Sequence, residues 1–193
     1  MPKKEIETYC PKSRLDWRKW LEKNHASKKS VWLVYYRVSS KVPSLSWSDA
    51  VDEALCFGWI DSTKKTIDKE SYMQYFSGRK SSSTWSLINK EKVEQLIQSK
   101  QMTKAGLDVI ETAKQNGNWS LMDAVEKLII PEDLETALNK EESAMEFFRS
   151  QTKSIRKGIL YWVVIAKRKE TREKRIAEVA ELAAKGLKPT HFG

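Results

Sequence analysis

Apolar residues near the N-terminus follow first a helical and then an extended spacing. A helix is predicted to begin at Ser13, whose hydroxyl can cap its first turn, and to end near Asn24. Residues 31–37 (VWLVYYR) are dense in β-branched and aromatic side chains and are too few for a helix of ordinary length. We therefore expect a strand there that is apolar on both faces and central in a sheet.

The next segment carries the strongest helical pattern in the chain. Ser46 is placed to cap this helix, and Gly58 follows as a left-handed stop. Its apolar positions recur at the spacing of one helix face, namely Trp47, Ala50, Val51, Ala54 and Leu55. Residues 59–67 and 71–78 then show a broken alternation around the turn-prone residues 68–70, which predicts an antiparallel hairpin.

From residue 89 the spacing is helical to the end of the chain. Helices are expected around 93–97, between a Thr103 cap and Gly117, from Ser120, from Pro131, and over 142–150, 154–166 and 170–185. We therefore predict an α+β protein, with a small antiparallel sheet of about three strands packed by helices in residues 1–87 and an all-helical part in residues 88–193. No stretch rich in Gly, Pro or Ser separates the two parts, so we expect one compact unit without a flexible linker.

The composition is that of a basic globular protein. The 193 residues include 35 Lys and Arg against 26 Asp and Glu, which gives a formal net charge of +9. Hydrophobic residues make up 40% of the chain, and it has only 7 Gly and 5 Pro. These values exclude the disordered and collagen-like classes, so we expect a compact fold.

Residues that most often carry metal and acid–base chemistry are scarce. Cys10 and Cys56 lie far apart and have no partner at metal-ligand spacing, so neither a metal site nor a disulfide framework is expected. The two histidines, His25 and His191, argue against a His-dependent catalytic triad. Cys56 falls within an apolar helical stripe, where a cysteine is usually an inert small hydrophobe. We predict no catalytic residue, no metal and no cofactor.

The sequence also suggests where the protein acts. The N-terminal residues carry scattered charges and no apolar run of about seven residues or more, so no export signal is expected. The longest apolar stretch, residues 158–166, is far shorter than the roughly 20 residues that cross a bilayer. We therefore expect a cytoplasmic protein without a transmembrane segment.

Positive charge is concentrated near the C-terminus. Residues 153–176 hold nine Lys and Arg against two Glu, a local excess of +7. On a continuous helix Arg168, Arg172 and Arg175 fall at i, i+4 and i+7, so their guanidinium groups would line one side and could bind phosphates or carboxylates. The alternative interpretation is a solvated helix face, on which Glu170 and Lys174 form an ordinary i, i+4 pair.

A second candidate surface lies between the hairpin and the helices that follow. It combines cations, small hydroxyl side chains, an amide and an indole, namely Arg79, Lys80, Ser83, Trp85 and Asn89. Such a set offers donors to an anion and a flat platform to a ring or a base. Alternatively, Ser86 and Asn89 only cap the next helix and Trp85 only fills the core.

The hairpin is expected to return Trp59 and Asp61 to the neighbourhood of that loop. Asp61 could act as a base if burial raised its pKa, but the sequence shows no second carboxylate at a defined spacing. A structural ion pair of Asp61 with Arg79 or Lys80 is the favoured interpretation. Most of the other tryptophans sit within apolar patterns and are expected to belong to the core, namely Trp17, Trp20, Trp32, Trp47 and Trp162.

Several segments together resemble the YdeI/OmpD-associated family of bacterial proteins, which is also called the bacteriocin-protection family. The resemblance spans about residues 15–186 and rests on Ala54–Ser62 (ALCFGWIDS), on Arg79, Lys80, Ser83, Trp85, Ser86 and Asn89, on Met102–Leu107, on Ala113, Lys114 and Gly117–Trp119, and on Ala166–Arg168, Glu170–Arg172 and Arg175–Ile176. At Ser77 and Gly78 the family pattern favours Thr-Pro. The loop before Arg79 is therefore expected to be less rigid here.

The resemblance implies no defined reaction, so three functions are weighed. The first is a non-enzymatic cytoplasmic binding protein, linked to bacteriocin or envelope-stress tolerance, whose basic surface recognises an unidentified anionic ligand or polyanion. The second is a nucleic-acid-binding protein that uses the basic C-terminal helices, although no helix-turn-helix, zinc-finger or RNA-binding signature is present. The third is a small enzyme with Asp61 in a cleft. The sequence does not predict the oligomeric state.

Overall fold

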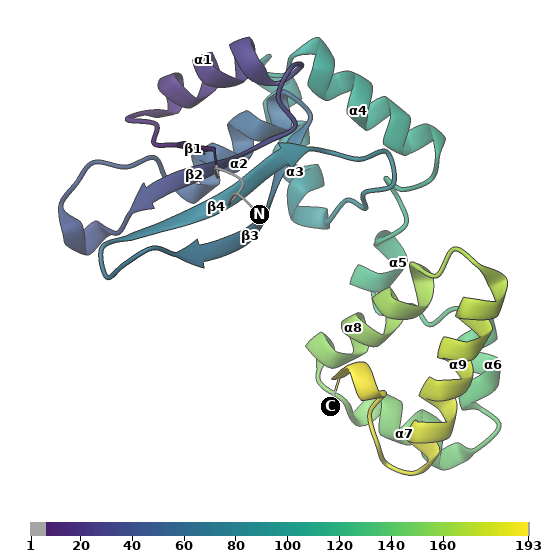
Figure 1. The fold of residues 1–193 in the computed structure, drawn as a ribbon. Coiled ribbons are helices and arrows are strands. Elements are labelled where there is room, and N and C mark those ends of the chain that lie inside the picture. The colour runs from purple at the N-terminus through teal and green to yellow at the C-terminus, as the bar shows by residue number, and fades with distance from the viewer. Residues whose placement is uncertain (1–6, 193) are drawn as a thin grey trace, which may run out of the picture. The chain divides into compact units, whose positions relative to one another are not determined.

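A computed structural model describes residues 7–192, and these form two compact units (Figure 1). The first unit contains the described residues up to Ser83 together with Ile88–Trp119. The second contains Thr84–Leu87 and the residues from Ser120 to the end of the described chain. No helix among the described residues is both long enough and apolar enough to cross a membrane.

A mixed sheet forms the base of the first unit. Its strands are β1 (Thr8–Tyr9), β2 (Ser30–Tyr36), β3 (Trp59–Thr66) and β4 (Ser71–Gly78), in the order β1-β2-β4-β3. Both β2 and β3 run antiparallel to β4, whereas β1 runs parallel to β2. The predicted α+β class and the hairpin are confirmed, and the fourth strand was missed because two residues leave no detectable pattern. A register shift between Asp61 and Lys64 marks a bulge in β3, which is an edge strand.

Helices in this unit begin where local capping chemistry places them. They are α1 (Arg14–Asn24), α2 (Trp47–Cys56), α3 (Leu87–Gln98) and α4 (Lys104–Gln115), with a short 3-10 turn η1 (Val38–Ser40). The side chains of Ser13, Ser46 and Thr103 each accept a hydrogen bond from a backbone N–H in the first turn, so all three predicted caps are confirmed.

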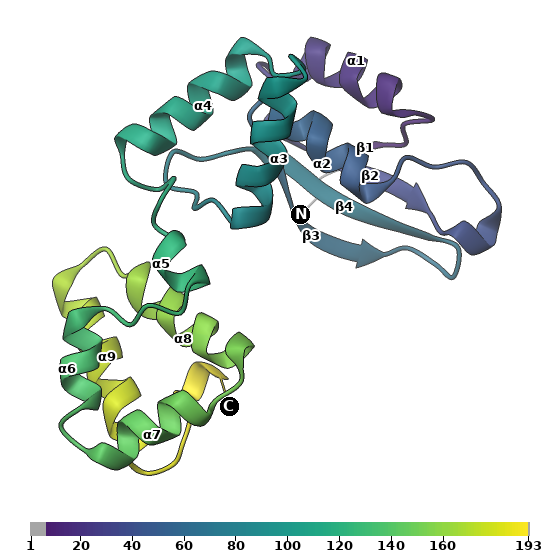
Figure 2. The same cartoon turned by 180° about the vertical axis from the view of Figure 1, so that it is seen from behind.

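Helices α1 and α2 cover one face of the sheet, which we call the inner face (Figures 1 and 2). Trp17 is fully buried there, where its ring meets Phe76 edge-on at 5.6 Å and its indole N–H donates to the Ala50 carbonyl. Trp20 stacks on Trp17 at 5.1 Å and meets Trp59 edge-on at 5.9 Å. This aromatic cluster is the centre of the first core.

Two glycines let α4 approach the end of α2. Gly58 has φ +73°, and a Cβ atom there would lie 2.8 Å from Val109 Cγ2. A Cβ atom on Gly106 would lie 2.4 Å from the Cys56 carbonyl oxygen. That oxygen accepts bonds from the Thr103 N–H at 3.1 Å and hydroxyl at 2.6 Å. Gly58, which was predicted to end the preceding helix, therefore also lets α4 pack closely against the chain after α2.

The second unit is built from helices around its own core. They are α5 (Asp123–Glu126), α6 (Glu132–Leu138), α7 (Glu142–Ser150), α8 (Lys153–Val164) and α9 (Lys169–Ala184), followed by a 3-10 turn η2 (Thr190–Phe192). Leu134, Leu138, Leu160 and Val163 are fully buried in this core. The helix expected from Ser120 begins only at Asp123, because turns occupy the intervening residues.

The division between the units follows contacts in space, while the predicted parts 1–87 and 88–193 within one compact unit stay a prediction. Helices do follow the sheet from residue 87, but α3 and α4 belong mainly to the sheet-bearing unit. Their place is set by contacts such as that of Gly106 with Cys56, which no periodicity in the sequence reveals. The compact units therefore divide after Trp119.

Candidate functional site

The loop after β4 is anchored at both of its ends. The Arg79 N–H donates to the Gly58 carbonyl at 2.9 Å. Further along, the Ser81 carbonyl accepts the side-chain amides of Asn116 and Asn118 at 2.8 and 2.9 Å. Lys80 is exposed, whereas Ser83 in the loop and Asn89 on α3 are partly buried. The loop is therefore held between the α2–β3 turn and the end of α4.

Trp59, Asp61 and Arg79 come together at the start of the hairpin. Trp59 lies opposite Gly78 in the register, directly before Arg79. Burial lowers the pKa of the Arg79 guanidinium to about 10, and the negative charge of Asp61 opposes that shift. Oδ2 of Asp61 accepts hydrogen bonds from the Trp47 indole at 2.9 Å and the Gln74 amide at 2.6 Å. Asp61 thus joins α2 to β3 and β4.

The tryptophans differ from their predicted roles. Trp59 and Trp85 were candidates for an exposed platform, but they are only 2% and 1% exposed. Trp59 instead donates its indole N–H to the His25 carbonyl at 3.2 Å. Trp47 was expected in the core and is 47% exposed, because it lies at the first position of α2 and reaches Asp61. The prediction that Trp47 belongs to the core is therefore wrong.

The arginines of α9 are engaged within the second unit. Arg172 binds both carboxylate oxygens of Asp133, at 2.6 and 2.8 Å, and Nη1 also donates to the Val163 carbonyl at 3.3 Å. Nη1 of Arg175 donates to the Trp162 carbonyl at 2.5 Å, and the guanidinium lies 5.0 Å from the Trp162 ring centre. Both side chains therefore satisfy carbonyl groups in the last turn of α8.

Arg168 and its neighbours remain on the surface. Arg168 is the N-cap residue of α9 and is exposed, as are Lys167, Lys169 and Lys174. A groove of about 510 Å³ lies beside Arg172. Its charged lining residues have both signs, namely Asp133, Glu173, Lys140, Lys169 and Arg172. The three arginines predicted to form one anion surface are thus divided between an exposed position and two internal contacts.

Net charge is divided unequally between the units. Residues 120–193 hold 14 Lys and Arg against 12 Asp and Glu, a net charge of only +2. The local +7 of residues 153–176 is largely balanced by acidic helices, as in the ion pairs Lys157–Glu126 and Arg172–Asp133. Residues 1–119 hold 21 Lys and Arg against 14 Asp and Glu, a net charge of +7. Most of the net positive charge therefore belongs to the sheet-bearing unit.

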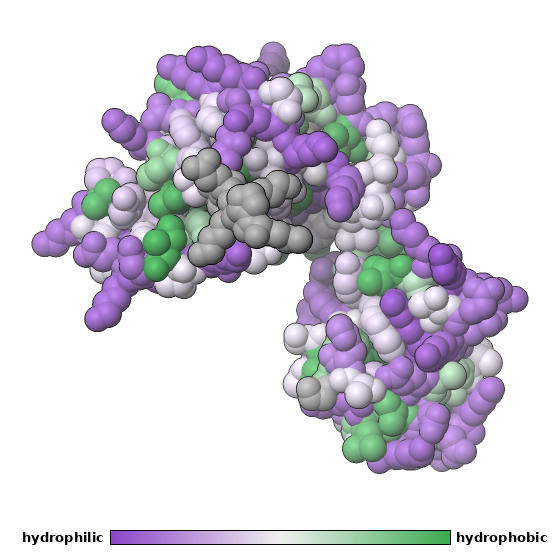
Figure 3. Space-filling view, viewed as in Figure 1, coloured by the Kyte–Doolittle hydropathy of each residue, from purple (hydrophilic) through white to green (hydrophobic). Residues whose placement is uncertain are grey.

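Cations and aromatic rings meet at the end of the sheet that carries the β3–β4 turn, which we call the hairpin end. Lys64 Nζ lies 4.0 Å from the centre of the Tyr72 ring, and the Arg37 guanidinium lies 5.9 Å from the same centre. Lys65 Nζ lies 4.7 Å from the centre of the Trp32 ring. Figure 3 shows hydrophilic side chains at the tips of this end with hydrophobic residues between them.

Tyr72 connects this end to the inner face. Its ring is stacked on Tyr35 at 5.0 Å with an interplanar angle of 8°. The Tyr35 hydroxyl is buried and has no hydrogen-bond partner among the described residues. Its pKa is raised, first by burial and then by the nearby Tyr72 and Asp61. Tyr35 is therefore a neutral, internal support for Tyr72.

In the sequence, the hairpin end is marked only by two adjacent lysines and by aromatic residues at alternate positions of another segment. Lys64 and Lys65 are adjacent in a strand, so they lie on opposite faces of the sheet. In residues 31–37 the alternate positions are buried and half-buried, so Trp32 and Tyr36 lie on the face opposite to Tyr35. Pairing the two strands through β4 brings Lys65 onto Trp32, which no single segment could indicate.

The described structure is thus that of an α+β sheet unit followed by a helical unit with its own core. Within it, no group of His, Cys, Asp and Glu side chains is arranged to hold a metal ion. Residues 9–109, more than half of the chain, match the family described as "Domain of unknown function (DUF8412)", and the chain belongs to this family. Searches of curated proteins and of solved structures found no match.

The C-terminal part matches a second family model. Residues 127–186 match "Bacteriocin-protection, YdeI or OmpD-Associated", which confirms the predicted family resemblance over this part of the chain. The match covers α6 to α9, including Arg168, Arg172 and Arg175. In this unit Arg172 and Arg175 complete the last turn of α8, and Arg172 also joins α6 to α9.

Proposed function

We propose that this YdeI/OmpD-associated protein acts in the cytoplasm by binding an anionic partner rather than by catalysis. The binding surface is the hairpin end of the first unit, where Arg37 and Lys64 stand over Tyr72 on the inner side of the sheet and Lys65 stands over Trp32 on the outer side. This proposal keeps the anion-binding function expected from the sequence and moves its surface away from Arg172 and Arg175, whose guanidinium groups have internal partners.

The observation that supports the proposal is that, in the described part of the chain, these three cations contact aromatic rings and have no carboxylate partner in an ion pair. Among the described residues, none of the three forms an ion pair with a carboxylate, and each stands over an aromatic ring. A ring contact orients a cation without neutralising its charge. The carboxylate of Asp68 accepts the N–H groups of Glu70 and Ser71 and keeps its negative charge, which offsets part of the charge of Arg37. An incoming anion would therefore meet oriented charge that is least compensated at Lys64 and Lys65.

Binding is favoured over catalysis by the state of the buried and half-buried carboxylates. Asp61 accepts two N–H donors on one oxygen. Glu53 is 2% exposed, and its two oxygens bind Arg14 at 2.6 Å and Arg18 at 2.8 Å. Both carboxylates therefore serve as fixed acceptors that join elements of the fold. The Asp61 enzyme hypothesis gains no support from these contacts.

A charge-removal experiment tests the proposed surface. The variant Arg37→Gln/Lys64→Gln/Lys65→Gln is compared with wild type for binding to fluorescein-labelled heparin, followed by anisotropy over a salt series. We expect at least a tenfold loss of affinity and a shallower salt dependence, because fewer counterions are released on binding. The matched control Lys167→Gln/Arg168→Gln/Lys174→Gln removes the same charge from exposed residues of the second unit, and it should lose less than threefold.

Two results would contradict the proposal. An equal loss in both triple variants would indicate a nonspecific effect of net charge. A loss confined to the control would place binding on the C-terminal helices instead.

A biological test follows from the family description. Cells lacking the encoding gene should become more sensitive to a bacteriocin, and the hairpin-end variant should fail to restore tolerance while the control variant restores it.

A further inference from the structure

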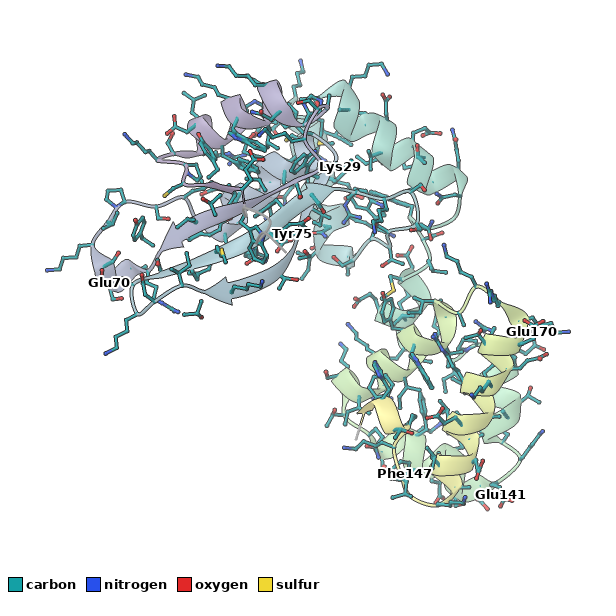
Figure 4. All side chains as sticks on the ribbon, viewed as in Figure 1. Lys29, Glu70, Tyr75, Glu141, Phe147 and Glu170 are labelled. Carbon is teal, nitrogen blue, oxygen red and sulfur yellow. The ribbon has the colours of Figure 1, made fainter. Side chains whose placement is uncertain are left out.

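The face of the sheet opposite to α1 and α2, the outer face, presents aromatic side chains. In β2 the burial alternates strictly, so Trp32, Val34 and Tyr36 are half-buried while Val31, Leu33 and Tyr35 are buried. In β4 the residues paired with Trp32 and Val34 are Tyr75 and Met73. Figure 4 shows Tyr75 on β4 within the sheet. The two inner strands β2 and β4 therefore carry this surface.

Trp32 and Tyr75 form a pair across these strands. They lie directly opposite each other in the register, their ring centres are 5.1 Å apart, and their planes are inclined by 59°. Both rings are partly exposed and are fixed by the strands that carry them. Rings that a sheet holds in this way can stack with flat, unpaired bases at little cost in conformational entropy.

Positive charge adjoins this pair. Lys65 on the neighbouring strand β3 places its ammonium group 4.7 Å from the Trp32 ring centre. Residues 1–119, which include all four strands, have a net charge of +7. Such a site suits a ligand that alternates flat rings with negative charges, because the flexible Lys65 side chain, which stands over the Trp32 ring, can move to a phosphate when a base takes its place. A duplex conceals the faces of its bases, whereas a single strand exposes them.

We propose that the outer face binds single-stranded nucleic acid, with bases stacked on Trp32 and Tyr75 and a phosphate at Lys65. This inference rests on the proposed anion-binding function and specifies its ligand. It places recognition on the sheet, whereas the nucleic-acid hypothesis from the sequence placed it on the basic C-terminal helices. The rings distinguish this ligand from an acidic protein surface, for which charge alone would suffice.

The test compares three probes on the full chain: fluorescein-labelled dT20, a duplex of the same length, and labelled heparin. The variant Trp32→Val/Tyr75→Val removes both rings and keeps residues that favour a strand. We expect its affinity for dT20 to fall at least tenfold. Its affinity for heparin should fall less than threefold, because the variant keeps the charge of Lys65 and removes only the ring that orients it. Tyr161→Leu, which removes a partly exposed ring from α8, is the control and should bind dT20 like wild type.

The outcomes separate this inference from the proposed function. Wild type that binds neither heparin nor dT20 at low salt contradicts both proposals. If wild type binds heparin and has equal affinity for the single strand and the duplex, the inference alone is overturned. The same holds if dT20 binding survives the loss of both rings. A stable dimer that dT20 does not dissociate and that Trp32→Val/Tyr75→Val abolishes would show that a second copy covers the outer face, and would also overturn it.

A measurement on wild type keeps the inference testable if the ring variant does not fold. Photo-crosslinking with an oligonucleotide that contains 5-iodouracil joins the base to an adjacent aromatic side chain, and mass spectrometry identifies the residue. We expect adducts on Trp32 or Tyr75. Adducts confined to residues 120–193 would place the nucleic acid on the helical unit and contradict the inference.

Discussion

Two arginines of α9 complete the C-terminal turn of α8, because the last carbonyl groups of a helix have no partner within that helix. Arg172 reaches Val163 and Arg175 reaches Trp162. Arg172 also forms a bidentate pair with Asp133 at the start of α6, so one side chain joins three helices. At this scale a guanidinium group acts as a structural connector, because its donors point in several fixed directions.

Removal of the Arg172 guanidinium should weaken the second unit. We expect Arg172→Gln to lower the free energy of unfolding by about 1 kcal/mol, since the Asp133 pair is partly solvent-exposed and its worth is reduced accordingly. Urea unfolding followed by circular dichroism measures the change. Lys174→Gln, an exposed site on the same helix, should stay within about 0.5 kcal/mol of wild type. Equal losses in both variants would contradict the connector role.

The same pair predicts a dependence on pH. The hydrogen bonds from Arg172 lower the pKa of Asp133 below its usual value. Since the folded-state pKa is lower than the unfolded one, the stabilisation is present above about pH 4 and is lost as the pH falls through the folded pKa. Wild type should therefore exceed Asp133→Asn in stability at pH 6 by more than at pH 2.5. A difference independent of pH in urea titrations would refute this.

At the scale of elements, contact between α2 and α4 depends on the absence of a side chain. A Cβ atom on Gly106 would lie 2.4 Å from the carbonyl oxygen and 2.8 Å from the carbonyl carbon of Cys56, and backbone atoms cannot rotate away. We expect Gly106→Ala to cost about 2 kcal/mol or more in urea unfolding, because α4 must shift. Gly117→Ala, with φ +78° and no atom within 4 Å, should cost only about 1 kcal/mol. A smaller loss at Gly106 than at Gly117 would contradict this.

Elements of the fold could be predicted from the sequence wherever local chemistry determines them. The caps at Ser13, Ser46 and Thr103 and the stop at Gly58 depend on residues within one turn, so they were predicted correctly. The start of α5 was not, because Ser120 has the chemistry of a cap but lies in a series of turns. A residue's side chain determines whether it can cap a helix, but contacts with the rest of the chain determine whether a helix begins there.

The candidate site was less predictable, because it depends on pairing between distant segments. Trp59 and Trp85 have the composition of a platform and are buried, whereas Trp47 has the spacing of a core residue and is exposed. Lys65 meets Trp32 only through two strand pairings across β4. A helix face can be derived from spacing alone, but the neighbours of a strand residue depend on strand order, which the sequence did not determine.

For the whole molecule, we expect a destabilising change in one unit to leave the other folded, because each unit has its own core. Cys56 is buried in the first unit, and its pKa is raised to about 11, chiefly by burial, so its thiol should resist a thiol reagent in the native protein. Cys10 is exposed and should react first. We expect one reactive thiol in native protein and two in denaturant. In native protein, Gly106→Ala should accelerate the reaction of Cys56, and Arg172→Gln should leave the rate of that reaction unchanged. Equal acceleration in both variants would contradict this.

The bulged edge strand has a consequence for solubility. An edge strand presents unpaired backbone groups to which a strand from another molecule can add, and proteins commonly oppose this with lysines and bulges. Strand β3 has a bulge between Asp61 and Lys64, and Lys64 and Lys65 follow it. The same two lysines would then both attract a polyanion and keep copies of the protein from joining edge to edge. Loss of those charges should therefore promote aggregation, a defect that a bound polyanion could not repair.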